Sequence, residues 1–435
     1  HVESKAETNM WKPSEDDLTA AENAITRASD LPLEVRRSLK QCLDLWRTVA
    51  EENTDDECKS TSREDVKSLA DELSARAWER LHSGPYKDVS LSCRQLYGLT
   101  CLIQSSLHLT SLKSDAPRPS DQDEQQLQEA FRAVDLGLIM GGEGPQRQLL
   151  LDLANHLQQL SEQWDEAEPP AKRQRTQGPL EPSVAIPTAA SASSIPTLDA
   201  EPDLETFLVQ FFLPKKPVLL RGVFRSWPAV DKWRDFSYLR KVAGRRTVPV
   251  EIGSSYIEDD WTQRLMPLRE FLDTYIATQA DHPSAAVAYM AQHTLFDQVP
   301  QLAADIPIPA ITACGDTSTL IRMAWIGPKG TVSPLHTDPY ENLFAQVRGA
   351  KYVRLYSPEE TPRLYPFKKG ILTNTSSVQA DIRDGSVDAA KFPEFGKASY
   401  VDCEVGAGDA LFIPKGWWHF IKSLDASISV SFWFE

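Results

Sequence analysis

The sequence lacks several features that mark familiar classes of protein. Its six cysteines include no Cys-x-x-Cys pair, so neither a zinc module nor a disulfide framework is predicted, and reduced thiols are expected. No stretch approaches the roughly 18 apolar residues of a membrane helix, and the N-terminal residues lack the apolar core of a signal peptide. We therefore expect a soluble nuclear or cytoplasmic protein with no membrane partner.

Positive charge is also scarce. The 435 residues include 46 Lys and Arg against 62 Asp and Glu, which gives a formal net charge of −16. Such a charge disfavours nonspecific attraction to nucleic acid, so no direct nucleic-acid partner is expected. The hydrophobic content of 41% is enough for two ordinary domains together with some unstructured chain.

Residues 1–165 show apolar side chains at helical spacing, as in Leu149, Leu153 and Leu157. This pattern predicts an all-helical N-terminal domain of five or six helices, which we expect to bind a protein partner. No fixed repeat period of 20 to 50 residues is evident, and stacked antiparallel helix pairs of the solenoid type stay an alternative.

Residues 166–202 are rich in Pro, Ala, Ser and Thr and too poor in apolar residues to form a core. The composition predicts a disordered linker. Its basic run Lys172–Arg175 has two equally weighted interpretations, a nuclear import signal or a solvated charge run.

Residues 203–435 contain many short β-branched and aromatic runs separated by Gly and Pro. Such runs, with few helices among them, predict a mainly β domain built as a sandwich or barrel. The whole chain is thus expected to be an α+β multidomain protein.

Metal-ligating residue types occur at two places in this β domain. His336 and Asp338 are two apart on a strand-like segment, so both side chains project from the same face. His419, which follows another apolar strand, is the candidate third ligand. Two histidines and one carboxylate are typical of a facial ferrous iron site, and zinc is the competing metal.

Two further residues suggest an anionic co-substrate. Lys351 alternates with Val353 and Leu355, which places its ammonium on an apolar face, where it either needs an anion or reaches water from an edge strand. Asn342 is either a second hydrogen-bonding group for the same ligand or a turn residue.

Several motifs together resemble the JmjC family of 2-oxoglutarate oxygenases over residues 203–435. These motifs are Pro217–Gly222 with Trp227–Ala229, His336-x-Asp338, Lys351–Tyr356 and Gly408–His419. The segments Tyr289–Gln298, Asn374–Ser376 and Ser429–Trp433 most resemble the jumonji-domain-containing protein 5 group within that family. The resemblance implies a C-terminal double-stranded β-helix, a cupin-like jelly-roll, behind a helical N-terminal domain.

The resemblance also implies roles for individual residues. Those implied are iron ligands at His336, Asp338 and His419; 2-oxoglutarate contacts at Lys351, Tyr289, Ser333, Asn342 and Trp325; and substrate contacts at Glu251, Tyr256, Gln292, Trp325 and Trp433. The alternative for the aromatic residues is an ordinary place in the core, and for Glu251 a place on the surface.

The activity that the resemblance implies uses Fe(II), 2-oxoglutarate and O2 as cofactors and releases succinate and CO2. The preferred reaction is hydroxylation of an arginine side chain in a basic protein or peptide, because Glu251 would pair with a guanidinium. A histone lysine demethylase acting as a chromatin regulator is the alternative, and a non-catalytic jelly-roll scaffold is the second one.

Overall fold

The computed structural model describes residues 11–51, 57–85, 88–112, 119–167, 195–253, 261–277, 287–370, 372–378, 381–383 and 386–435. The chain forms two compact units: His1–Gln174 with Arg245–Thr247, and Arg175–Gly244 with Val248–Glu435. Most of the predicted linker and the whole basic run Lys172–Arg175 lie outside the described residues. The domain bounds at residues 165 and 203 therefore stay a prediction.

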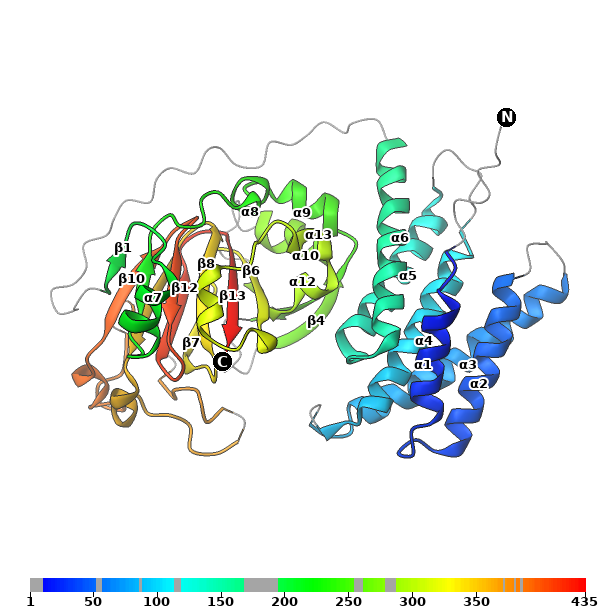
Figure 1. Cartoon of the computed structure of the whole chain (residues 1–435), viewed down its shortest axis with the longest axis horizontal. Coiled ribbons are helices and arrows are strands. Elements are labelled where there is room, and N and C mark those ends of the chain that lie inside the picture. Colours follow the sequence, from blue (N-terminus) through cyan, green and yellow to red (C-terminus); the bar gives the residue numbers. More distant parts are fainter. Residues whose placement is uncertain are drawn as a thin grey trace. The chain divides into compact units, whose positions relative to one another are not determined.

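The described residues between 11 and 167 of the first unit form an all-helical region, as predicted (Figure 1). Its helices are α1 (Glu15–Thr26), α2 (Leu33–Glu51), α3 (Glu57–Leu81), α4 (Leu91–Leu109), α5 (Asp121–Met140) and α6 (Pro145–Ala167). Serine side chains mark three of the starts, because Ser14, Ser90 and Ser120 each accept a hydrogen bond from a backbone N–H of the first turn. None of the helices described here is long and apolar enough to cross a membrane.

A continuous apolar core joins these helices. Leu39 and Leu43 of α2, Leu99 of α4 and Phe131 of α5 are completely buried in it. The helical periodicity of the sequence thus gives each helix an apolar face directed at its neighbours.

The second unit contains two facing β-sheets (Figure 1). The nine-stranded sheet has, in spatial order, β1 (Thr197–Leu198), β2 (Val218–Leu220), β11 (Ala410–Ile413), β8 (Glu341–Arg348), β13 (Ser427–Phe434), β6 (Ile321–Gly327), β5 (Ala288–His293), β3 (Thr247–Ile252) and β4 (Thr262–Pro267). The four-stranded sheet has the order β10 (Val401–Val405), β9 (Lys351–Tyr356), β12 (Trp418–Ser423) and β7 (Val332–Thr337). This is the predicted jelly-roll.

Short helices accompany the nine-stranded sheet. They are α7 (Leu204–Phe207) with the π-helical turn η3 (Leu208–Phe212), α8 (Pro228–Lys232), α9 (Phe236–Ala243), α10 (Leu268–Phe271) with the π-helical turn η4 (Leu272–Ala277), α12 (Leu295–Gln298) and α13 (Pro300–Ala303). The 3-10 turns are η5 (Ala310–Cys314), η6 (Thr317–Thr319), η7 (Pro358–Arg363) and η8 (Phe395–Lys397). Apolar side chains of the helices and of one sheet face, such as Phe207, Trp233 and Phe432, form the largest core of this unit.

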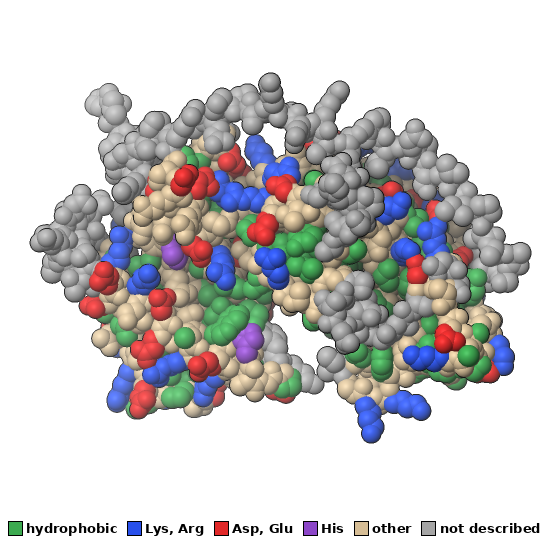
Figure 2. Space-filling view, turned by 180° about the vertical axis from the view of Figure 1, so that it is seen from behind, with side chains coloured by type: hydrophobic (Ala, Val, Ile, Leu, Met, Phe, Trp, Pro, Cys, Tyr) green, Lys and Arg blue, Asp and Glu red, His purple; other side chains and the backbone are tan. Residues whose placement is uncertain are grey.

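The interior between the two sheets positions the site. Phe344 of β8, Val353 and Leu355 of β9 and Ile421 of β12 pack together there. On β13, Val430 and Phe432 belong to the core beside the helices, so the alternate residues Ser429 and Ser431 have the opposite orientation. On the surface in view in Figure 2, acidic and basic side chains are interspersed.

Candidate metal and co-substrate site

The structure brings His336, Asp338 and His419 together inside the jelly-roll. His419 of β12 is the cross-strand partner of His336 on β7, and their ring centroids are 4.1 Å apart. Nε2 of His336 lies 3.7 Å from Oδ1 of Asp338, and Nε2 of His419 lies 3.5 Å from Oδ2. The three ligand atoms lie within 4.8 Å of one another, which is the spacing that a shared metal ion needs.

Backbone carbonyls orient both imidazoles. Nδ1 of His336 lies 2.7 Å from the carbonyl oxygen of Pro334, and Nδ1 of His419 lies 3.0 Å from that of Trp417. A carbonyl can only accept, so each Nδ1 carries the proton and each Nε2 presents its lone pair to the centre of the trio.

The electrostatics of the trio also suit a cation. Burial and then the nearby His419 lower the pKa of His336 to about 4, so this ring is neutral at physiological pH. Burial opposes ionisation of Asp338, but the nearby His419 and His336 outweigh it and lower the pKa of Asp338. Two neutral imidazoles and one carboxylate fit ferrous iron and leave further coordination positions for other ligands.

An additional segment supports the strand that carries these ligands. The backbone N–H of Thr337 donates to the carbonyl of Asn374 at 2.9 Å, and Nδ2 of Asn374 donates to the carbonyl of Thr337 at 2.9 Å. Thr375 forms a β-bridge with His336. Sequence reasoning noted the Asn374–Ser376 run only as a family resemblance and gave it no role, because nothing local in the run indicates its distant partner.

Lys351 lies in the interior and is 1% exposed. Its Nζ is 2.9 Å from the hydroxyl of Tyr289 and 5.4 Å from the ring centroid of Phe344. Strand β9 pairs with both β10 and β12, so the alternative of an edge-strand lysine that reaches water is wrong. Burial lowers the pKa of Lys351 to about 7, and an anion in this interior would reverse that shift.

Two of the other residues predicted for the co-substrate, Ser333 and Trp325, lie beside Tyr289, the hydroxyl partner of Lys351. Ser333 hydrogen-bonds the hydroxyl of Tyr289, whose pKa is raised by burial. The rings of Tyr289 and Trp325 have centroids 6.0 Å apart, and the indole N–H of Trp325 donates to the hydroxyl of Ser431 at 3.0 Å.

Asn342 is a strand residue and not the turn residue of the alternative interpretation. It lies on β8, where it pairs with Ile413 and Trp433. Its side chain is buried, and Oδ1 has no hydrogen-bond partner among the described residues. A buried acceptor of this kind is expected to be used by a ligand or by water.

The residues predicted for the substrate lie on several strands. Glu251 of β3 pairs directly with Tyr289 of β5, and it is half-buried rather than a surface residue. Burial raises the pKa of Glu251, although a hydrogen bond from Trp261 acts in the opposite direction. Gln292 is exposed and has a left-handed backbone with φ of 51°, a strained conformation for a residue other than glycine.

Two predicted aromatic contacts differ in how far the structure describes them. Trp433 is buried, stacks on Tyr340 with centroids 5.5 Å apart, and has an indole N–H without a hydrogen-bond partner among the described residues. Tyr256 lies outside the described residues. Sequence reasoning did not identify Tyr340, although it lies only two residues from Asp338.

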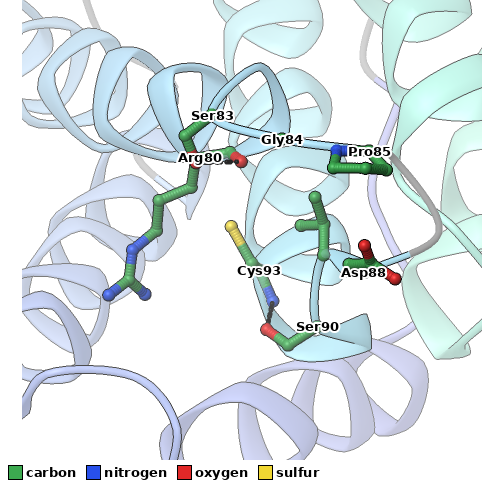
Figure 3. A pocket seen from close by; sticks show the side chains of 8 residues that line it. Arg80, Ser83, Gly84, Pro85, Asp88, Ser90 and Cys93 are labelled. Carbon is green, nitrogen blue, oxygen red and sulfur yellow. Dashed lines mark hydrogen bonds between the residues drawn. The ribbon is translucent and has the colours of Figure 1, made fainter.

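The helical unit has a hollow of its own, with a volume of about 220 Å³. Figure 3 shows it at the connection between α3 and α4, where Arg80, Asp88 and Cys93 are among the lining residues. The hydroxyl of Ser90 there accepts the backbone N–H of Cys93 as the start of α4. None of the predicted site residues lines this hollow.

Comparisons with known proteins agree with the site. Residues 204–435 match the family described as "Cupin-like domain", and residues 56–174 match "KDM8-like, N-terminal ARM repeats". The second match supports the solenoid alternative for the helical unit.

Similar proteins cover most of the chain. The chain is 40% identical to "Lysine-specific demethylase 8" of Danio rerio, over 82% of this chain and 85% of that protein. It is 35% identical to "Jumonji C domain-containing protein 5" of Drosophila melanogaster, over 84% of this chain and 86% of that protein. It is 26% identical to the human "Bifunctional peptidase and (3S)-lysyl hydroxylase JMJD7", over 56% of this chain and 84% of that protein. The chain therefore belongs to the JmjC family of 2-oxoglutarate-dependent oxygenases, in the group of its lysine-specific demethylase 8 and Jumonji C domain-containing protein 5 relatives.

Proposed function

We propose that this oxygenase hydroxylates a C–H bond of an arginine side chain in a basic protein or peptide, with Fe(II), 2-oxoglutarate and O2, and that it releases succinate and CO2. The observation that carries the proposal is the carboxylate of Glu251. It is half-buried and its pKa is raised by burial, and none of the cationic side chains in the described parts of the chain forms an ion pair with it. Such a carboxylate gains most from a planar cation that it can bind through both oxygens, which is a guanidinium.

The residues of the jelly-roll have separate tasks in this proposal. His336, Asp338 and His419 hold the iron, which supplies the activation of O2 when it is bound. Lys351 would bind the distal carboxylate of 2-oxoglutarate, with Tyr289 and Ser333 completing that end of the pocket.

Other residues would contact 2-oxoglutarate near the metal. Asn342 is proposed to contact 2-oxoglutarate near the iron through its side-chain amide, because that side chain is buried in the interior and Asn342 is not a turn residue. Trp325, fixed by its bond to Ser431, would form one wall of the pocket.

The substrate side rests on four of the predicted residues. Glu251 binds the guanidinium in this proposal, and Gln292, Trp433 and Tyr256 surround the side chain. The unpartnered indole N–H of Trp433 would donate to a backbone carbonyl of the peptide, because a buried donor favours a ligand with an acceptor and a guanidinium has none.

Lysine demethylation is the second candidate. It is favoured by the printed name of the relative from Danio rerio, a lysine-specific demethylase. Both reactions use the same site and differ in which carbon faces the metal.

A histone is one candidate substrate for either reaction, and the ARM-like helical unit is proposed to bind a protein partner. The nucleus and the cytoplasm are the proposed locations.

Mass spectrometry of peptides treated with the full-length chain tests the proposal. We expect a mass gain of one oxygen on arginine, which depends on Fe(II) and 2-oxoglutarate and is lost in His336→Ala. Loss of a methyl group from methyl-lysine without any arginine product would favour the demethylase instead. No product from any basic peptide, together with no succinate, would favour the non-catalytic scaffold.

A further inference from the structure

We infer that Glu341 is a positioning residue that anchors the turn leading into the metal ligand His419. Glu341 is the first residue of β8 and is 2% exposed. Its Oε2 accepts the backbone N–H of Lys415 at 3.0 Å, and its Oε1 lies 2.5 Å from Nζ of Lys215. Its carboxylate therefore connects the start of β8 to the turn between β11 and β12.

That turn is bonded to the metal trio through its backbone. The N–H of Gly416 donates to the carbonyl of Asp338 at 3.2 Å. The carbonyl of Trp417 accepts the proton of Nδ1 of His419, and the indole N–H of Trp417 donates to the carbonyl of Lys215 at 3.0 Å. A displacement of this turn would therefore change both the position of Asp338 and the orientation of the His419 ring.

The role of Glu341 is indirect. Its carboxylate is not one of the groups gathered around the metal position, and both of its oxygens already have donors. A buried carboxylate is retained at a considerable desolvation cost, which the bonds from Lys415 and Lys215 offset. Groups that hydrogen-bond the segments carrying metal ligands hold those ligands in the geometry that the metal requires.

Two substitutions separate the position of the carboxylate from its charge. Glu341→Asp keeps the charge but shortens the side chain, so that its oxygens withdraw from Lys415. Glu341→Gln keeps the length and an acceptor oxygen but removes the charge. Because the inferred role is positional, Glu341→Gln is expected to preserve the site and Glu341→Asp to loosen it.

The readout is the affinity of the full-length chain for Mn(II), measured without turnover from the electron paramagnetic resonance signal of free Mn(II). We expect Glu341→Asp to bind Mn(II) at least about tenfold more weakly than wild type. Glu341→Gln should stay within about threefold, and Lys215→Met, which removes only the ammonium, should do the same. The melting temperature of each metal-free variant shows whether the fold itself has changed.

Each result is decisive. Wild-type affinity in Glu341→Asp overturns the inference, and so does an equal loss in Glu341→Asp and Glu341→Gln, since charge would then be what matters. If Glu341→Asp does not fold, Glu341→Met decides: it keeps the length of the side chain but removes both acceptor oxygens, and unchanged Mn(II) affinity overturns the inference. The inference rests on the metal site, and wild type that fails to bind Mn(II) would reject that site as well. Mn(II) binding is independent of the choice between arginine and lysine.

Discussion

Nζ of Lys351 lies 2.9 Å from the hydroxyl of Tyr289, and the two residues come from opposite sheets of the jelly-roll. The pair therefore spans the interior in which the metal trio also lies. No carboxylate among the described residues forms an ion pair with Lys351, and its pKa is lowered to about 7 by burial alone. The interior is thus suited to a ligand that brings its own negative charge.

The pKa of Lys351 predicts how 2-oxoglutarate binding depends on pH. Below about pH 7 the ammonium is already charged, so binding of the dianion requires no proton. Above pH 7 the free lysine is neutral and must take up a proton, while Tyr289 stays protonated because burial raises its pKa. The dissociation constant should therefore rise by up to about tenfold per pH unit above pH 7.

Calorimetry of the Mn(II)-loaded chain measures this dependence, and buffers with different ionisation enthalpies report the proton uptake. Lys351→Arg is the matched control, because an arginine stays charged throughout this range. A dissociation constant that is constant from pH 6 to pH 9 in wild type would contradict the prediction.

Removal of one metal ligand should abolish all turnover. Asp338→Ala takes away the only carboxylate of the trio and leaves two neutral imidazoles, which hold a hard divalent cation poorly. We expect succinate release to fall below detection, with or without peptide, and the bound iron to be lost. Asp409→Asn, a change in a carboxylate outside the trio, should retain iron. Iron content and succinate are both measured, and substantial iron in Asp338→Ala would argue against this ligand set.

Substitution of Glu251 should affect the peptide and spare the co-substrate. Glu251→Gln keeps the shape of the side chain and removes the charge that we propose for the guanidinium. Loss of one partner of a buried charge pair costs about 2 kcal/mol or more, which corresponds to a decrease in kcat/KM of at least about 30-fold. The KM for 2-oxoglutarate should not change. Glu359→Gln, at an exposed glutamate, is the control, and full activity of Glu251→Gln on arginine peptides would remove the main support for the proposed substrate.

The helical unit offers a test of stability. The indole N–H of Trp46 donates to the hydroxyl of Ser106 at 2.8 Å, and both side chains are buried. Ser106→Ala leaves that N–H without a partner, so the free energy of unfolding should decrease by about 1 to 3 kcal/mol. Denaturant unfolding followed by circular dichroism measures the change. Thr48→Ala, at an exposed helical position, should stay within about 0.5 kcal/mol of wild type, and an equal effect of both substitutions would disprove the role of the bond.

Local patterns in the sequence were sufficient to predict those parts of the fold that depend on residues close together in the chain. The spacing of apolar residues predicted the helical unit, because the period of a helix fixes which side chains share a face. The two-residue spacing of His336 and Asp338 predicted that their side chains share a face, because alternate residues of a strand project to the same side. The place of His419 after another apolar strand made it the candidate third ligand, and motif resemblance then supplied the jelly-roll.

Other features depend on the register of strands that are distant in the chain, and only the tertiary structure determined them. The pairing of His419 with His336 includes an irregularity between His419 and Ile421, which no local pattern indicates. Likewise, Lys351 is interior because β9 has neighbours on both sides, and the anchor between Glu341 and Lys415 depends on where β8 begins and β11 ends. Bond geometry decides which residues share a face of one strand, whereas the packing of both whole sheets decides which strands meet and in what register.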